Sequence, residues 1–240
     1  MGIEPTTPSL PWRCSATELQ GRTDPFWPLD DVSHSERLTP PRACSTLPCQ
    51  KFSRSLATIQ AVYTRLVESG DAEPIMAIYN REIIETTTTF DLIPRDLIEQ
   101  HTWIEDHLGA HPALVAIDDQ ATSGLRGARR EVVTGFAALG PYRPRAAYAP
   151  TVENSVYVAQ ELRGQGVGRL LLTDLIRTAA DAGFHSMIAR IVGENVASIR
   201  LHEACGFSVV GVEHEVGRKH GKWLDVVELQ RLLDDVSPAE

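Results

Sequence analysis

The sequence lacks the features that mark several classes of protein. No apolar run approaches the roughly 20 residues that a membrane-spanning helix needs. The N-terminus has no basic segment followed by an apolar one, as a secretory signal would. Its few cysteines show no Cys/His spacing typical of a metal site, and Cys205 reads as a small buried hydrophobe. We therefore expect a cytoplasmic protein with no metal and no membrane partner.

Positive charge is also scarce. The chain has 23 lysines and arginines against 32 aspartates and glutamates, which leaves a formal net charge of -9. Because surfaces that bind nucleic acids are basic, we expect no nucleic-acid partner. A hydrophobic content of 42% is typical of a globular protein. The length of 240 residues suits one domain with an extension.

The first 57 residues differ from the rest in composition. They are rich in proline, serine, threonine and arginine and show no sustained periodicity, so residues 1–57 are predicted to be a disordered extension. A second hypothesis is a start-site artefact, since Met1–Pro8 and Cys14–Gln20 resemble peptides read through the complement of a transfer-RNA gene. Peptides from this segment in the natural protein's mass spectrum would refute that hypothesis. The folded domain is expected at 58–234, followed by a tail at 235–240.

From residue 58 onward, the hydrophobic periodicity predicts an α/β domain. Helices are expected at 74–85, 97–108, 167–182 and 195–206. Strands are expected at 61–68, 113–117, 131–139, 153–159, 187–192, 209–215 and 224–229. Strands alternate with helices at first and then cluster as hairpins. The sheet should therefore be mixed rather than all parallel.

A glycine loop lies between a predicted strand and a predicted helix, in V-Y-V-A-Q-E-L-R-G-Q-G-V-G-R-L-L-L, Val156–Leu172. Glycines let backbone N–H groups approach a phosphate closely, and the helix that follows adds its dipole. Arg169 argues against two alternatives. A P-loop needs lysine there, and the dinucleotide-binding fingerprint needs glycine or alanine.

The segment R-G-Q-G-V-G, Arg163–Gly168, resembles the acetyl-CoA loop of the GNAT superfamily of N-acetyltransferases. The order of elements also fits that superfamily. A strand, the loop, a helix and another strand are followed by Asn195, which opens a short helix that ends at Gly206-Phe207. The resemblance implies a GNAT fold, a central twisted and mostly antiparallel sheet flanked by helices. It also implies acetyl-CoA as the co-substrate.

Several separated motifs resemble one family within that superfamily, the phosphinothricin and L-amino-acid N-acetyltransferases. They are Tyr79–Ile83 (Y-N-R-E-I), Pro141–Arg145 (P-Y-R-P-R), Thr151–Val158 (T-V-E-N-S-V-Y-V), Arg200–Phe207 (R-L-H-E-A-C-G-F) and Gly217–Asp225 (G-R-K-H-G-K-W-L-D). The resemblance implies acetylation of the α-amino group of a small amino acid or analogue, such as phosphinothricin, methionine sulfoximine or methionine sulfone. It implies direct transfer through a tetrahedral intermediate, in a homodimer.

The same resemblance assigns the site residues. Glu153 and His202 are the expected acid/base groups, since the amine must lose a proton and the departing thiolate must gain one. Many superfamily members have tyrosine where this chain has His202, and the division of roles between the two residues stays open. The expected acetyl-CoA contacts are Tyr157, Val158, Arg163, Gly164, Gln165, Gly166, Val167, Gly168, Asn195 and Ser198. The expected acceptor pocket consists of Phe90, Arg143, Arg145 and Tyr148.

Two other functions fit the sequence less well. Protein N-terminal or lysine acetylation is disfavoured, because Arg143 and Arg145 would share a face on a strand and could grip a free carboxylate. A peptide N-terminus has no such group. A non-catalytic CoA-binding module is disfavoured by the presence of both Glu153 and His202. No role is predicted for Lys219, Trp223 and Asp225.

Overall fold

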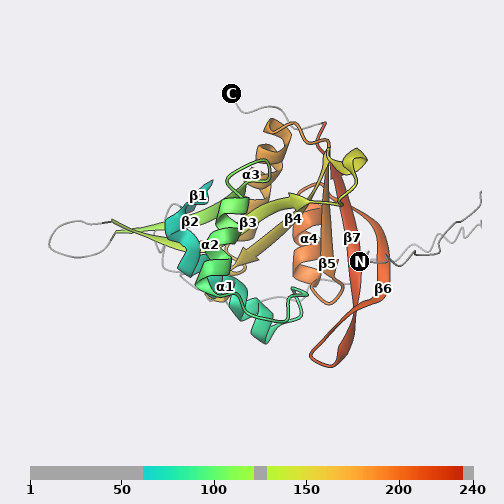
Figure 1. The fold of residues 1–240 in the computed structure, drawn as a ribbon, viewed down its shortest axis with the longest axis horizontal. Helices are drawn as coiled ribbons and strands as arrows, with labels where there is room; N and C mark the ends of the chain where they lie inside the picture. The colour runs from blue at the N-terminus through green and yellow to red at the C-terminus, as the bar shows by residue number, and fades with distance from the viewer. Residues whose placement is uncertain (1–61, 122–128, 235–240) are drawn as a thin grey trace, which may run out of the picture. The chain divides into compact units, whose positions relative to one another are not determined.

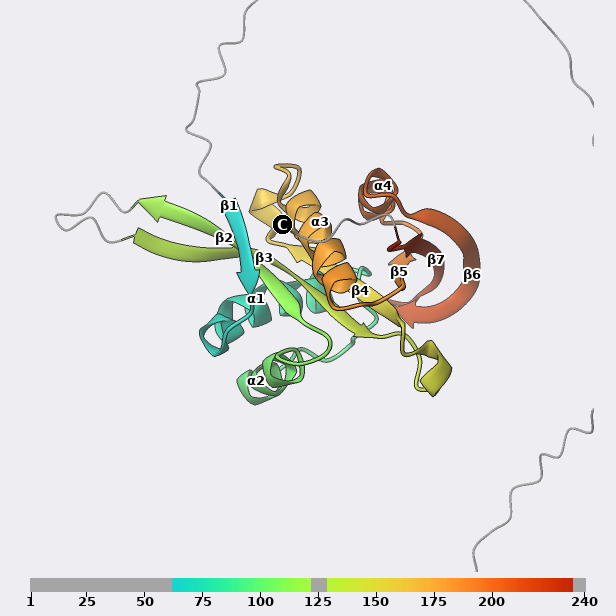
Figure 2. The ribbon, with the colours of Figure 1, turned by 90° about the horizontal axis from the view of Figure 1, so that it is seen from above.

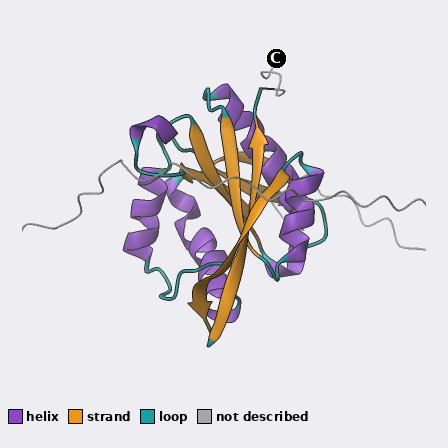
Figure 3. Cartoon of the chain, turned by 90° about the vertical axis from the view of Figure 1, so that its right-hand side faces the viewer, coloured by secondary structure: helices purple, strands orange, loops and turns teal. Residues whose placement is uncertain are grey.

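The computed structural model describes residues 62–121 and 129–234, which form one mixed sheet with helices on both faces (Figures 1 and 3). The predicted extension and C-terminal tail lie outside these residues. The strands are β1 (Val62–Leu66), β2 (Ala113–Ala121), β3 (Arg129–Pro141), β4 (Thr151–Val158), β5 (Ser186–Val192), β6 (Ser208–Lys219) and β7 (Lys222–Leu232). The helices are α1 (Ala72–Glu85), α2 (Leu97–Asp106), α3 (Val167–Asp181) and α4 (Val196–Ala204). Short 3-10 turns lie at Ser69–Asp71, Ala146–Tyr148 and Gln160–Leu162.

The strand order is β1-β2-β3-β4-β5-β7-β6. Every neighbouring pair is antiparallel except β4 and β5, which are parallel. This arrangement confirms the predicted mixed, mostly antiparallel sheet. The β2–β3 hairpin is longer than predicted, and its arms project beyond the helices in Figure 2. Strand pairing needs only backbone groups, so the ladder continues past the apolar residues that guided the prediction.

The caps of α3 and α4 lie where the sequence predicted them, whereas α1 begins two residues earlier and α2 ends two residues earlier than predicted. The helix α3 begins after Gly166, at φ 92°, and is followed by Gly183, at φ 82°. Both values are left-handed, where glycine carries no Cβ penalty. The Asn195 side-chain oxygen accepts from the Ser198 N–H at 3.2 Å and caps α4. Across residues 62–121 and 129–234, no helix has the length and apolarity that crossing a membrane would require.

Each face of the sheet covers its own apolar core. The first lies under α3 and includes Leu171, Leu175 and Met187, while the second lies under α1 and α2 and includes Ile75 and Phe136. Full burial of one such side chain contributes about 1.5–3 kcal/mol, so each core is a substantial part of the stability. Cys205 is buried at the edge of the first core, as predicted for a small hydrophobe.

The sheet splits between β4 and β5. Thr151–Asn154 pair with Ser186–Ala189, and beyond that point both strands continue without pairing to each other. Their outer partners, β3 and β7, stay paired along the same stretch. The divergence therefore opens a gap in the middle of the sheet, beside the glycine loop.

Candidate active site

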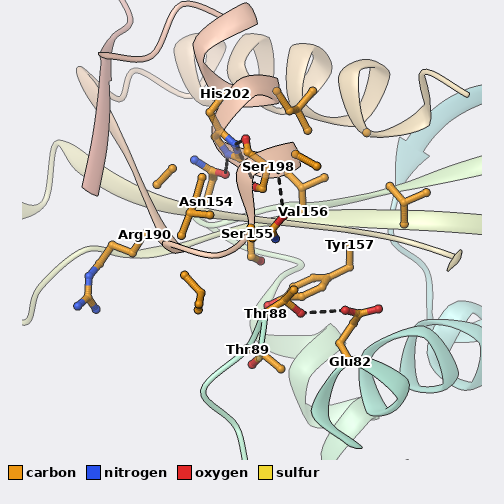
Figure 4. Close-up of a pocket in the computed structure, with 18 of the residues that line it drawn as sticks. Glu82, Thr88, Thr89, Asn154, Ser155, Val156, Tyr157, Arg190, Ser198 and His202 are labelled. Atoms are coloured by element: carbon orange, nitrogen blue, oxygen red, sulfur yellow. Dashed lines mark hydrogen bonds between the residues drawn. The ribbon is translucent and has the colours of Figure 1, made fainter. Parts of the chain in front are cut away.

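A cavity of about 600 Å³ lies where β4 and β5 diverge (Figure 4). Its walls come from the two strand ends, the glycine loop, α4 and the loop that follows α1. Most of the predicted site residues line it: Phe90, Glu153, Tyr157, Val158, Arg163, Gly164, Gly166, Gly168, Asn195, Ser198 and His202. The cavity has further lining residues for which the sequence predicted no role, among them Glu82, Thr88, Thr89, Asn154 and Arg190.

Two predicted acetyl-CoA contacts do not line this cavity. The Gln165 side chain donates to the Glu161 carbonyl at 3.1 Å, and Val167 is buried in the core beneath the loop. Their predicted contacts stay predictions.

The predicted acceptor residues Arg143, Arg145 and Tyr148 also lie outside the lining, in the loop that joins β3 to β4. The two arginines would share a face if they lay on a strand, but β3 ends at Pro141 and they lie in a loop. Proline has no N–H for a ladder, and Pro144 follows close behind. The Arg143 guanidinium instead lies over the rings of Tyr142 and Tyr148, at 4.8 and 5.7 Å from their centres.

The three glycines of the loop serve different purposes. Gly164 and Gly166 have φ values of 73° and 92°, a left-handed backbone that turns successive N–H groups into one concavity. No atom lies within 4 Å of where their Cβ atoms would be. At Gly168 a Cβ would lie 3.3 Å from Leu201, so this glycine lets α3 approach α4. The first two glycines and the N-terminus of α3 therefore fit a pyrophosphate group.

Arg163 holds the loop in place. Its Nε donates to the Val158 carbonyl at 3.2 Å, and its guanidinium pairs with the Glu82 carboxylate. The buried Glu82 also accepts from the Thr86 and Thr88 hydroxyls, at 3.2 and 2.8 Å. A buried carboxylate needs such partners, so Glu82 is satisfied and joins the glycine loop to the loop after α1.

The side chains of β4 alternate between the two faces of the sheet. Val156 and Val158 pack against the α3 core, whereas Tyr157 packs against the core of α1 and α2 and stacks on Phe136 at 5.2 Å. Glu153 shares the face of Tyr157. The Asn154 side chain lies on the other face and contacts α4 through His202. In Figure 4, His202 and Ser198 lie on one side of β4, and Thr88 and Glu82 lie on the other.

His202 is held by two oxygen atoms. Its Nδ1 lies 2.8 Å from the Ser198 carbonyl, and its Nε2 lies 3.0 Å from the Asn154 side-chain oxygen. Asn154 in turn donates to the Ile188 carbonyl at 3.1 Å, across the start of the split. Oxygens of this kind only accept, so the arrangement is fully satisfied when both ring nitrogens carry protons. Burial lowers the pKa of His202, partly opposed by the Ser198 hydrogen bond, so a proton held there is readily donated.

Glu153 lies among charged side chains on the face of α1 and α2. Burial raises its pKa, and Arg190 opposes that shift, while Glu228 and Glu213 reinforce it. A carboxylate with a raised pKa is a better proton acceptor near neutral pH. In the described part of the chain, no cluster of histidine, cysteine, aspartate and glutamate side chains suits a metal ion.

The tip of the β6–β7 hairpin holds the loop that carries Phe90. A Cβ at Gly217 would lie 2.4 Å from the Phe90 ring, so only glycine allows this packing. The buried Lys219 ammonium donates to the Thr89 carbonyl at 2.8 Å. Lys219, which had no predicted role, therefore fixes one wall of the cavity.

The other two motif residues without a predicted role lie nearby on the hairpin. Trp223 lies under the Arg218 guanidinium, at 5.5 Å from the ring centre. Asp225 accepts from the Glu215 N–H at 2.8 Å and pairs with His214 at 3.0 Å. Both residues therefore have contacts within the hairpin.

The split sheet, the glycine loop and the helix behind it define the class of the protein. A family model described as the acetyltransferase (GNAT) domain matches residues 64–227, which is more than half of the chain. The chain belongs to the GNAT acetyltransferase family. The resemblance inferred from the sequence motifs is thereby confirmed.

Individual acetyltransferases are similar to the chain over most of their length. The chain is 39% identical over 171 residues to the L-methionine sulfoximine/L-methionine sulfone acetyltransferase of Pseudomonas aeruginosa, covering 71% of this chain and 94% of the relative. A solved phosphinothricin acetyltransferase from Sinorhizobium meliloti, in complex with AcCoA, matches with a TM-score of 0.64 and 34% identity over 75% of this chain and 94% of that one. A ribosomal-protein-alanine N-acetyltransferase from Brucella melitensis matches with a TM-score of 0.63 and 35% identity, over 70% and 98%.

Proposed function

We propose that the protein transfers the acetyl group of acetyl-CoA to the α-amino group of a small amino acid or analogue. The acceptor is of the methionine sulfone, methionine sulfoximine or phosphinothricin type. The observation that carries this proposal is the cavity at the β4–β5 split, which has the glycine loop on one side and Glu153 on the other. Relatives named for these acceptors, at 39% and 34% identity, support it.

The residues around the split fit acetyl-CoA. Gly164, Gly166 and the N-terminus of α3 would hold the pyrophosphate. The part of β4 without a β5 partner, Ser155–Val158, offers backbone groups along the pantetheine arm, and an N–H there would stabilise the oxyanion. Bound acetyl-CoA supplies an activated acyl group as a thioester.

Glu153 acts as the general base on the face of α1 and α2. It takes one proton from the acceptor ammonium, so that the neutral nitrogen forms its bond to the acetyl carbon. Its raised pKa suits this task. The carboxyl group passes this proton to water and then takes the second proton from the nitrogen of the tetrahedral intermediate, which goes to water in the same way. His202 is recharged from water after it has protonated the sulfur, so each acetyl transfer releases one proton.

His202 acts on the opposite face, beside α4. It donates its Nε2 proton to the sulfur as the carbon–sulfur bond breaks, so that CoA leaves as the thiol. Asn154 orients the ring for that step. Because Glu153 and His202 lie on opposite faces of β4, the two protons of the nitrogen leave on one face and the proton for the sulfur enters from the other. This proposal assigns the base to Glu153 and the acid to His202, a division that the sequence left open.

We also propose that the enzyme is a cytoplasmic homodimer. Edge strand β6 and its neighbour expose apolar side chains, Val210, Val212, Val216 and Trp223, and a bare apolar edge on a monomer favours association. Light scattering after gel filtration should give the mass of two chains. A single-chain mass at micromolar concentration would refute the dimer.

An acceptor panel tests the proposed activity. Release of CoA is followed with acetyl-CoA and methionine sulfone, phosphinothricin, common free amino acids and a short peptide. We expect turnover with at least one free amino acid or analogue. Turnover with the peptide alone would favour protein acetylation. Binding of CoA without turnover of any amine would favour a non-catalytic module.

A further inference from the structure

The cavity contains few cationic side chains, and they differ in their surroundings. Those that line it are Arg163, Arg169 and Arg190. Arg163 is already held by Glu82 and the Val158 carbonyl. Arg169 lies in the first turn of α3, next to the glycine loop on the acetyl-CoA side. Arg190 alone belongs to the face of the sheet that carries Glu153.

The strand register sets Arg190 beside Glu153. In the parallel β4–β5 pair, Glu153 is aligned with Ile188, and Arg190 follows two residues later on the same face. The strands diverge at this point, so the two side chains flank the opening of the split. Their charges interact, since Arg190 lowers the pKa of Glu153. A carboxylate and a guanidinium group are thereby placed on neighbouring strands at the rim of one cavity.

The Arg190 guanidinium retains free donors. It pairs through one terminal nitrogen with Glu213 of β6, and no other side chain among the described residues hydrogen-bonds to it. A guanidinium has five N–H groups in a rigid fork, so the remaining groups can bind a second carboxylate. The Glu213 contact holds the fork in place before the ligand arrives.

An α-amino acid carries its ammonium and its carboxylate on the same carbon atom. Glu153 is proposed above as the base that receives the ammonium proton. The carboxylate of the same acceptor then lies close to Glu153 and needs a cation at that point. Arg143 and Arg145 lie outside the cavity lining, in the loop between β3 and β4.

We propose that Arg190 binds the α-carboxylate of the acceptor and thereby selects free amino acids over amines that lack this group. The inference rests on the proposed function and specifies the substrate class of the same site. Carboxylates already surround Arg190, namely Glu153, Glu213 and Glu228. An acceptor with an ammonium next to its carboxylate matches this surrounding, whereas a plain carboxylic acid would be repelled.

The test compares methionine sulfone with its α-carboxamide, which differs only in the acidic group. In the wild type we expect kcat/KM to favour the acid. In Arg190→Met the preference should fall about 10- to 100-fold, the range for a charged hydrogen bond. Arg190→Lys should keep part of it. The ratio of the two substrates is measured on one preparation, so a loss of folded enzyme cancels.

Matched controls are Arg143→Met and Arg145→Met. We expect both to keep the wild-type preference, and all three methionine variants to keep the KM for acetyl-CoA. A preference unchanged in Arg190→Met, or lost in either control instead, would overturn the role of Arg190 and leave the proposed activity intact. No turnover of either substrate by the wild type would overturn the proposed acceptor class and this inference with it.

Discussion

The two faces of β4 are built in different ways. The face toward α3 and α4, here called the donor face, takes its cavity residues from one stretch of chain, residues 154–202, and combines backbone groups and glycines with polar side chains and a single histidine. The face toward α1 and α2, here called the acceptor face, is assembled from β4, β5, β7 and the loop after α1. It carries Glu82, Glu153 and Arg190. The comparison indicates that a shared donor can be held by one local motif. Under the proposed roles, the acceptor is selected by charges brought together from distant segments.

The largest expected loss of activity follows from a substitution on the acceptor face. Glu153→Gln removes the proposed base while keeping its size, so kcat should fall about 10²- to 10⁴-fold. The wild-type kcat/KM should rise as the pH rises through the pKa of Glu153, because the carboxylate must be ionised to accept a proton. Burial sets that pKa above its ordinary value.

Steady-state rates across a pH series check this prediction. The rise with pH should be absent in Glu153→Gln, while the KM for acetyl-CoA stays unchanged. A variant that keeps its rate and its acid limb would exclude Glu153 as the base.

A smaller loss is expected on the donor face. His202→Gln removes the proton donor, and kcat should fall about 100-fold, the lower end for acid catalysis, because a thiolate leaves more easily than most groups. Asn154→Ala acts through the same hydrogen bond, at 3.0 Å. The double variant should therefore be little worse than His202→Gln alone. Fully additive losses would mean that Asn154 does not orient the ring.

The smallest loss of activity is expected from a substitution at Lys219, which holds the loop that carries Phe90. Lys219→Met removes the donor to the Thr89 carbonyl and leaves that oxygen buried, which should cost about 1–3 kcal/mol in the free energy of unfolding. Loosening of the loop should raise the KM of the acceptor a few-fold and leave that of acetyl-CoA unchanged. Urea unfolding and initial rates measure the two effects. Equal changes in both KM values would show that the hairpin supports the whole cavity instead.

The sequence predicted the donor face well because its signals are local. Glycines at left-handed positions, such as Gly166 and Gly183, and a capping residue such as Asn195 act within a few residues of themselves. Phe207 and Asn195 frame a short helix whose ends are visible without knowing the fold. The predicted helices follow from periodicity of the same short range.

The acceptor face was predicted poorly because its partners are far apart in the sequence. Glu82 lies 81 residues from its partner Arg163, and Arg190 lies beside Glu153 only because β4 and β5 pair in parallel. Arg143 and Arg145 were expected in the acceptor pocket, but β3 ends at Pro141 and the loop that carries them lies outside the cavity lining. Such placements depend on tertiary contacts that no local pattern encodes.

Under the proposed mechanism, the two faces of β4 bind different substrates. Calorimetry of acetyl-CoA binding, without an acceptor, tests this division most directly. Gly166→Ala forces a Cβ onto a backbone at φ 92°, at a cost of about 1–2 kcal/mol, so acetyl-CoA should bind roughly tenfold more weakly. Glu153→Gln and Arg190→Met should bind it as tightly as the wild type. If those two variants weaken acetyl-CoA binding as much as Gly166→Ala does, the division between the faces is wrong.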